Sequence, residues 1–294
     1  MSYLGFESRI TLKSKPRDHP VPEGPEIQRA ADALSKTIVG QQLTRIILRY
    51  PPIRRYQTQL QNQTINLIEA RGKAMVTHFD QGLTLYSHNQ LYGLWQTATP
   101  STPLLKNRQL RLELGSDAAS IRLYSATDIE FLTPSQLKQH PYLGKLGPDI
   151  LDPSLVSQDI VDRLANPRFA KHNLGALLLN QGFLAGIGNY LRSEILFAAG
   201  LDANIRVEAL TPKSRWRLGQ VAIKIANQSY RHDGVTRPQS HYRALRQQGA
   251  DYETARFWVF DRAGEPCYRC DHAIAMRSQN QRRFYFCSEC QPSP

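Results

Sequence analysis

The sequence lacks long hydrophobic runs and is poor in cysteine. None of its apolar stretches reaches the ~18 residues that a membrane-spanning helix needs, and residues 1–21 lack the apolar core of a secretory signal. Only four of the 294 residues are cysteines, too few for a disulfide-rich scaffold. These absences argue against membrane-embedded and secreted classes of protein. We expect a cytoplasmic protein whose thiols stay reduced.

Acidic residues are scarce relative to basic ones. The chain has 37 lysines and arginines against 25 aspartates and glutamates, a net charge of +12, and the excess is spread over both halves. A chain of this length is expected to form about two domains. An even positive charge suits two lobes placed on one polyanion. The alternative is a soluble protein that merely has a high isoelectric point.

The four cysteines form two CxxC pairs with sixteen residues between them: Cys267, Cys270, Cys287 and Cys290. Two such pairs can place four thiolates around one tetrahedral zinc ion, with the intervening segment folded back as a β-hairpin. Four thiolates leave no open coordination position, so the spacing predicts one structural Zn²⁺ per chain and no catalytic metal. The alternative is a pair of disulfides, which a reducing compartment disfavours.

The segment Pro22–Glu26 follows Val21. A proline within a chain is a tertiary amide without a nucleophilic lone pair, whereas a chain-terminal proline is a secondary amine that can form an iminium. Valine shares the codon GUG with bacterial translation starts. We therefore hypothesise that residues 1–21 are a mis-annotated or disordered extension. The working protein would then begin at Pro22, after loss of its initiator methionine.

The periodicity of the chain predicts an α+β protein. Helical spacing runs from Pro25 to Gly40. Short β-like segments follow, and their hairpin-length gaps indicate an antiparallel β-sandwich: 43–48, 65–69, 75–79, 83–87, 110–114 and 121–124. Proline and glycine then mark a linker, and helical patterns resume at 157–166, 172–180, 189–199 and 211–227.

A glycine-rich segment, Gly182–Tyr190, allows close backbone approach to phosphate oxygens, and its Asn189 is a capping residue for the next helix. With the other motifs, this segment makes the chain resemble the formamidopyrimidine-DNA glycosylase/endonuclease VIII superfamily, most closely its endonuclease VIII branch, over about residues 22–291. The resemblance depends on PEGPE (22–26), RGKA (71–74), LYSHNQLYG (85–93), LGPDILDP (146–153), GFLAGIGNYLR (182–192) and the CxxC pairs.

The resemblance implies a fold in which two lobes clamp DNA in the cleft between them. The N-terminal lobe would be an antiparallel β-sandwich with an N-terminal helix. The C-terminal lobe would be a helix–two-turn–helix domain with a four-cysteine zinc-finger hairpin. The expected units are the extension 1–21, a catalytic domain 22–145, a linker 146–154, a helical DNA-binding domain 155–256 in which 228–256 form a mobile or lesion-contacting loop, and a zinc finger 257–291.

By the same resemblance, the chain would be a DNA glycosylase and AP lyase of base excision repair. Pro22 would attack the sugar C1′ and form a Schiff base, and β- and δ-elimination would then cut the strand. Glu23 would be the general acid and base, Lys73 would contact the lesion phosphate and assist β-elimination, and Arg282 would serve δ-elimination. Arg283 stands where a close relative is expected to have proline, so either arginine could reach the reaction centre.

The triplet Gln90-Leu91-Tyr92 supplies a polar group, an aliphatic wedge and a stacking ring, which can fill the gap left by a flipped base. In the resembled branch this contiguous triplet plugs the duplex, and it favours oxidised pyrimidines as substrates. The alternative is a strand edge whose leucine and tyrosine pack inward. Lys145 and Asn189, like Gln90, align with DNA contacts. Glu26 matches a second acidic position, which either orients the site or is a simple helix N-terminal charge.

The expected partner is double-stranded DNA with oxidised bases or abasic sites, bound by a monomer without any membrane, in the bacterial cytoplasm and at the nucleoid when on DNA. Two other functions stay open. If residues 1–21 persist, Pro22 is acylated and the clamp would bind lesions without catalysis. The same chemistry could also act on oxidised purines.

Overall fold

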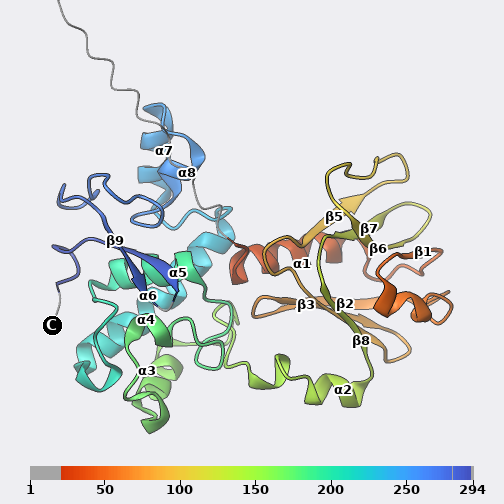
Figure 1. Cartoon of the computed structure of the whole chain (residues 1–294), viewed down its shortest axis with the longest axis horizontal. Coiled ribbons are helices and arrows are strands. Elements are labelled where there is room, and N and C mark those ends of the chain that lie inside the picture. The colour runs from red at the N-terminus through yellow and green to blue at the C-terminus, as the bar shows by residue number, and fades with distance from the viewer. Residues whose placement is uncertain (1–20, 280, 293–294) are drawn as a thin grey trace, which may run out of the picture.

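The computed structural model describes residues 21–279 and 281–292, so residues 1–20 of the expected extension lie outside the described residues. The chain forms two lobes, one built of sheets and the other mainly of helices (Figure 1). Helix α1 (Gly24–Ile38) lies where the two lobes meet. Within the described ranges, no helix has the length and apolar character needed to cross a membrane.

Helix α1 forms where the sequence predicts it because its start is encoded locally. Pro25 lies in the first turn, where its missing N–H group costs no hydrogen bond. The Glu26 carboxylate accepts the backbone N–H of Glu23 at 3.1 Å, which satisfies a donor at the helix start. The buried face has apolar residues at helical spacing: Ile27, Ala31, Leu34 and Ile38. The helix therefore holds the Pro22–Glu23 segment at the lobe junction.

The first lobe is a sandwich of two four-stranded antiparallel sheets, as predicted. One sheet has the strand order β1-β6-β7-β5 and the other β2-β3-β4-β8. The strands are β1 Arg45–Leu48, β2 Ile65–Arg71, β3 Ala74–Phe79, β4 Thr84–His88, β5 Leu94–Ala98, β6 Leu110–Gly115, β7 Ser120–Tyr124 and β8 Asp128–Leu132. Buried side chains of both sheets, such as Leu85 and Leu112, share one apolar core. Strands β5 and β8 were not among the six predicted segments.

The second lobe packs its helices around a separate apolar core. The helices are α3 Ser157–Ala165, α4 Leu174–Leu177, α5 Asn189–Ala199, α6 Pro212–Arg231, α7 Gln239–Gln247 and α8 Tyr252–Arg256. Helix α2 (Pro134–Gln139) joins this lobe to the sandwich, and 3-10 turns lie at Pro51–Tyr56, Leu143–Lys145, Pro167–Phe169 and Val207–Ala209.

The expected loop at 228–256 contains two helices, so the expectation of a loop is wrong for much of this segment. Asp251 accepts the backbone N–H of Thr254 at 2.7 Å and so caps α8. Tyr242 and Leu245 of α7 are half-buried. These helices are too short for sequence periodicity to reveal, and their stability depends on such caps and tertiary contacts.

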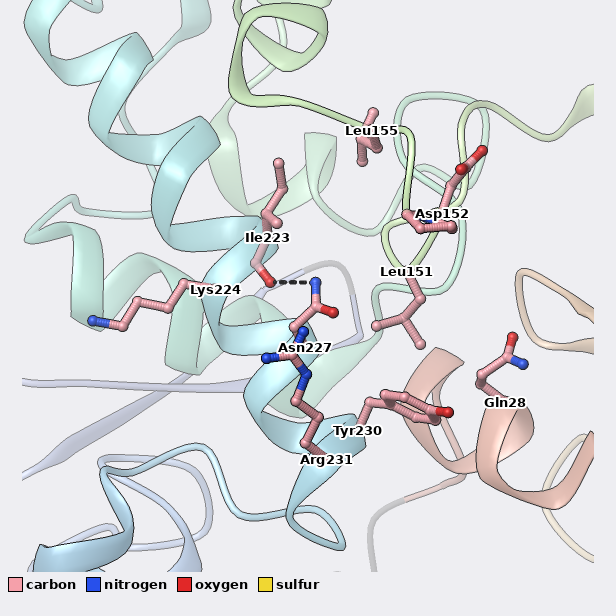
Figure 2. A pocket seen from close by; sticks show the side chains of 10 residues that line it. Gln28, Leu151, Asp152, Leu155, Ile223, Lys224, Asn227, Tyr230 and Arg231 are labelled. Atoms are coloured by element: carbon pink, nitrogen blue, oxygen red, sulfur yellow. Dashed lines mark hydrogen bonds between the residues drawn. The ribbon is translucent and has the colours of Figure 1, made fainter. Parts of the chain in front are cut away.

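The linker 146–154 is attached to both lobes. The Asp149 carboxylate accepts the N–H of Gly72 in the sandwich at 2.8 Å, and the Ile150 N–H donates to the carbonyl of Ala185 at 3.0 Å. Next to the linker, α1 and α6 border a groove of about 640 Å³, whose lining includes Gln28, Leu151 and Tyr230 (Figure 2). None of the predicted site residues lines this groove, so the candidate site lies elsewhere.

The segment between the cysteine pairs is the predicted β-hairpin. Strand β9 (Ala275–Gln279) pairs antiparallel with β10 (Arg282–Phe286). Phe284 and Tyr285 are buried in the second core, whereas Arg282 and Arg283 are exposed. The aromatic residues thus anchor the hairpin and leave the two arginines at its surface.

Candidate active site

A cleft of about 770 Å³ receives residues from both lobes and from the cysteine-bounded hairpin. Seven of the predicted catalytic and DNA-contact residues line it: Pro22, Glu23, Lys73, Gln90, Leu91, Asn189 and Arg282. They come from positions up to 260 residues apart in the sequence, so their convergence is produced by the fold. Tyr92 does not line the cleft, and Lys145 lines a neighbouring groove that also contains Arg168 and His172.

Glu23 reaches from the first lobe into the second. Its carboxylate accepts the backbone N–H groups of Gly188 at 2.7 Å, Tyr190 at 2.8 Å and Leu191 at 3.3 Å, at the start of α5. A side chain at position 188 would collide with this carboxylate, so the approach requires glycine there. The helix start supplies donors that suit an acidic side chain.

Burial controls the protonation of Glu23, which is only 3% exposed. Burial raises the pKa of Glu23 to about 7, although the charge of Lys73 opposes the rise, and the charge of Glu26 adds to it. A carboxyl group with this pKa is close to half protonated at neutral pH. It can therefore act as either a proton donor or a proton acceptor there.

Lys73 lies in the tight turn between β2 and β3. Gly72 has a φ of +63°, which permits the turn, and the Lys73 N–H donates to the hydroxyl of Tyr142 at 3.2 Å. Burial lowers the pKa of Lys73, an effect that the charge of Glu23 opposes and that of Arg282 reinforces. The side chain of Lys73 thus lies close enough to the Glu23 carboxyl for their charges to interact.

The structure distinguishes the two adjacent arginines of β10. Arg282 lines the cleft and Arg283 does not. The carbonyl of Arg283 instead accepts the side-chain amide of Asn189 at 2.9 Å and the guanidinium of Arg192 at 3.2 Å. These bonds tie the hairpin to α5 through the main chain and leave Arg282 to face the site.

The triplet Gln90-Leu91-Tyr92 forms the turn between β4 and β5 and projects outward. Gln90 has a φ of +48°, and its side-chain carbonyl accepts the hydroxyl of Thr127 at 3.2 Å. Leu91 is 64% and Tyr92 71% exposed, so the alternative in which both pack inward is wrong. Large apolar side chains on a fixed turn beside a cleft are available to contact a ligand.

The four cysteines come together as free thiols, and no disulfide links them. Their sulfur atoms all lie within 4.8 Å of one another. The separations include 3.4 Å for Cys270–Cys287 and 3.9 Å for Cys267–Cys290. Zinc–sulfur bonds of about 2.3 Å in a tetrahedron separate the sulfurs by about 3.8 Å. The four thiols thus fit a tetrahedral metal ion.

Among the side chains of the cleft that were not predicted as site residues are His88 and Tyr142. His88, at the end of β4, accepts the backbone N–H of Gln90 at 3.0 Å, and its ring meets that of Tyr142 edge-on at 5.4 Å. Burial lowers the pKa of His88. His88 lies within the LYSHNQLYG motif, which could have indicated it, whereas nothing in the local sequence indicates Tyr142.

Comparison with known proteins agrees with this architecture. The formamidopyrimidine-DNA glycosylase N-terminal domain matches residues 21–127. Endonuclease 8 of Escherichia coli O17:K52:H18 (strain UMN026 / ExPEC) and endonuclease 8 of Shigella sonnei (strain Ss046) are each 44% identical over 271 residues, covering 92% of this chain and 100% of the relative. Lactococcus lactis Fpg (MutM), solved with N7-benzyl-Fapy-dG DNA and with abasic-site DNA, shares the fold with a TM-score of 0.76 at 23% identity, covering 92% of this chain and 100% of that one.

The two-lobed fold is the one that Lactococcus lactis Fpg has, and the 44% identity to endonuclease 8 shows that the chain is a DNA glycosylase of the formamidopyrimidine-DNA glycosylase superfamily. The enzymes of this class are bifunctional DNA glycosylases and AP lyases of base excision repair, and this protein is one of them. Within the superfamily, the chain belongs to the endonuclease 8 family.

Proposed function

We propose that the protein removes oxidised pyrimidines from double-stranded DNA through a Schiff base on Pro22, and nicks the strand by β,δ-elimination. The observation that carries this proposal is the position of Pro22 in the cleft, beside Glu23 and Lys73. The match to the family domain begins at residue 21, which supports a working chain that starts at Pro22. The nitrogen of Pro22 would then be a free secondary amine.

A free α-amine suits the first step because it loses its proton easily. Its pKa is near ~8, against ~10.4 for an ordinary lysine, so a useful fraction is neutral at pH 7. The amine of Pro22 attacks C1′ of the damaged nucleotide and the bond from C1′ to the base breaks. The iminium forms when the bond from C1′ to the ring oxygen O4′ also breaks. The departing base and O4′ each take up one proton, of which one comes from Glu23 and the other from the nitrogen of Pro22. The product is an iminium between Pro22 and C1′.

Strand cutting follows from the acidity of that iminium. Loss of a proton from C2′ expels the 3′ phosphate, which is β-elimination, and a further proton loss expels the 5′ phosphate, which is δ-elimination. Lys73 places a positive charge where the first phosphate departs, and Arg282 does so for the second. Hydrolysis of the remaining imine restores the amine of Pro22.

The outward turn at Gln90–Tyr92 supports duplex DNA as the substrate form. Removing a base from the stack costs a few kcal/mol and leaves a gap, and the exposed side chain of Leu91 can enter it as a wedge. Asn189 at the start of α5 and Lys145 near the linker add donors for phosphate oxygens. A two-lobed clamp closes around one duplex, so we propose that it acts as a monomer.

We also propose one structural Zn²⁺ held by the four cysteine thiolates. The ion would fix the ends of the β9–β10 hairpin, and with them the position of Arg282. It supplies no chemistry to the reaction, since four thiolates complete its coordination.

The test compares three chains on a DNA duplex with an abasic site: one that begins at Pro22, one with a single extra residue before Pro22, and the 294-residue chain. Borohydride reduces a Schiff base to a stable covalent adduct. We expect rapid trapping only with the first chain. Equal trapping with all three would show that another amine is the nucleophile. No trapping by any, with tight binding retained, would favour the non-catalytic lesion-binding protein.

The pyrimidine preference is tested separately, by excision from duplexes that carry thymine glycol or 8-oxoguanine. We expect faster excision of thymine glycol. Faster excision of 8-oxoguanine would instead establish the oxidised-purine alternative.

A further inference from the structure

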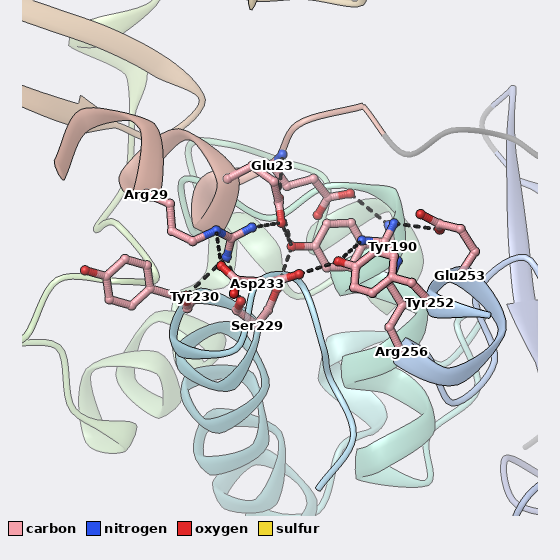
Figure 3. A network of polar contacts seen from close by, with 10 residues as sticks. Glu23, Arg29, Tyr190, Ser229, Tyr230, Asp233, Tyr252, Glu253 and Arg256 are labelled. Carbon is pink, nitrogen blue, oxygen red and sulfur yellow. Dashed lines mark hydrogen bonds and ion pairs between the residues drawn. The ribbon is translucent and has the colours of Figure 1, made fainter. Parts of the chain in front are cut away.

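A network of polar contacts lies behind Glu23, at the junction of α1, α5 and α6 (Figure 3). Its centre is the carboxylate of Glu26, which accepts the backbone N–H of Glu23 at 3.1 Å and the guanidinium of Arg29 at 2.8 Å. The hydroxyl of Tyr190, from α5, donates to the same carboxylate at 3.0 Å. Glu26 therefore links the other lobe to the peptide that joins Pro22 and Glu23.

Tyr190 is held so that its hydroxyl keeps this direction. The side chain is 1% exposed, and the hydroxyl oxygen also lies 2.9 Å from the hydroxyl oxygen of Ser229 on α6. Burial raises the pKa of Tyr190 well above its ordinary value, so the group stays protonated and can donate. Its ring packs against Phe257 and Phe260, with centroids 5.3 Å and 6.2 Å away.

Arg29 fixes the other side of the network. Its guanidinium donates to the carbonyls of Ser229 at 2.7 Å and Tyr230 at 3.2 Å, in the last turn of α6. These carbonyls have no partner within the helix, and a cation is favoured there. Arg29 thereby holds α1 against the end of α6, with Glu26 between Arg29 and Tyr190.

We propose that Tyr190 is a positioning residue for the reaction: its hydroxyl orients Glu26, which holds the Pro22–Glu23 peptide plane and so aims the nitrogen of Pro22 at the cleft. The inference rests on the proposed role of Pro22 as nucleophile. Pro22 is attached directly to that peptide, so rotation of the peptide moves the attacking nitrogen. A displacement of about 1 Å is enough to slow such a step severely.

The substitution Tyr190→Phe isolates the hydroxyl. It keeps the ring and its packing, and it keeps the backbone N–H that Glu23 accepts. A matched control is Tyr230→Phe, because the hydroxyl of Tyr230 bonds Asp32 at 2.6 Å across the same junction and does not contact Glu26. Both variants would be made in the chain that begins at Pro22.

The experiment measures the single-turnover rate of borohydride trapping and, separately, the Kd for a duplex with a tetrahydrofuran abasic analogue. For Tyr190→Phe we expect trapping about tenfold slower, since a bond to a charged group is lost in the attacking geometry, with Kd unchanged. For Tyr230→Phe we expect both values to stay at the unsubstituted level.

Trapping by Tyr190→Phe at the unsubstituted rate would overturn the inference, as would equal slowing by both variants, which would indicate a loosened junction. If the unsubstituted chain itself gives no covalent adduct with borohydride, Pro22 is not the nucleophile and the inference about Tyr190 is wrong as well. Should Tyr190→Phe not fold, as judged by circular dichroism, Glu26→Gln tests the same connection. Slower trapping at unchanged Kd is again the supporting result, and unchanged trapping overturns it.

Discussion

Replacing Glu23 with glutamine is expected to make the protein more stable at alkaline pH while abolishing base excision. The Glu23 carboxyl is buried and its pKa is raised from 4.5 to about 7. A carboxyl with a raised pKa contributes stability that is fully present below pH 4.5 and is lost as the pH rises through 7. Glutamine has nearly the same shape and does not ionise, so the variant escapes this loss.

The size of the effect follows from the two pKa values. One pKa unit corresponds to about 1.36 kcal/mol, so a rise from 4.5 to about 7 represents about 3 kcal/mol in all. Between pH 5.5 and pH 8.5 the folded protein loses about 2 kcal/mol of this stabilisation. The advantage of Glu23→Gln over the unsubstituted chain should therefore grow by about 2 kcal/mol across that range, or about 4–8 °C in Tm for a protein of this size.

The assay is urea unfolding of the 294-residue chain and its Glu23→Gln variant at pH 5.5, 7 and 8.5. In this chain Pro22 is acylated and adds no charge beside Glu23. Glu113→Gln is a matched control: Glu113 is buried too, but its bonds to Arg122 and Ser120 outweigh burial and lower its pKa. The difference in unfolding free energy between Glu113→Gln and the unsubstituted chain should be constant from pH 5.5 to 8.5. A Glu23→Gln difference that is equally constant would refute a raised pKa at Glu23.

Three other predictions concern the hairpin, the cysteines and the exposed turn. In the chain that begins at Pro22, Arg282→Ala should give β-elimination products in place of β,δ-elimination products on a sequencing gel. Arg283→Ala should still give β,δ-elimination products, because Arg283 makes its contacts with α5 through its main-chain carbonyl, which alanine keeps. The reverse pattern would assign the δ-elimination role to Arg283. Elemental analysis should find one zinc per chain, and Cys270→Ser should lose it and lower Tm, since structural zinc contributes folding energy directly; a metal-free native protein would contradict this. Leu91→Ala should slow excision from duplex DNA about tenfold while changing unfolding free energy by less than about 0.5 kcal/mol, because this side chain is 64% exposed; undiminished excision would remove Leu91 as the wedge.

Features of the fold that are encoded by nearby residues could be predicted from the sequence. Helix α1 has its proline, its acidic first turn and its apolar spacing within fifteen residues. The spacing of the two CxxC pairs is visible in the sequence itself and predicted both the hairpin and the cluster of four thiols. Strand β5 was missed because it does not alternate clearly between buried and exposed positions, whereas β8 does alternate over its first four residues and was overlooked.

The contacts that make the site work join distant parts of the chain. Glu23 and Tyr190 are 167 positions apart, and no periodicity or local motif indicates that the backbone of one will hold the side chain of the other. The resemblance to a known family supplied the proposed catalytic residues, but it did not supply the raised pKa of Glu23 or the donors around Glu26. Those properties arise from burial and from contacts between the lobes, which exist only once the chain has folded.

The hydrogen bonds from the start of α5 to the Glu23 carboxylate have a consequence for protein engineering. Neither half of the molecule, expressed alone, would have a Glu23 carboxyl with a raised pKa. The first half contains the side chain, whereas the second contains the backbone N–H groups that bind the carboxylate and helps to bury it. Chimaeras that exchange halves between homologues should therefore retain activity only if the second half has a glycine at position 188 and the same backbone N–H donors at the start of α5.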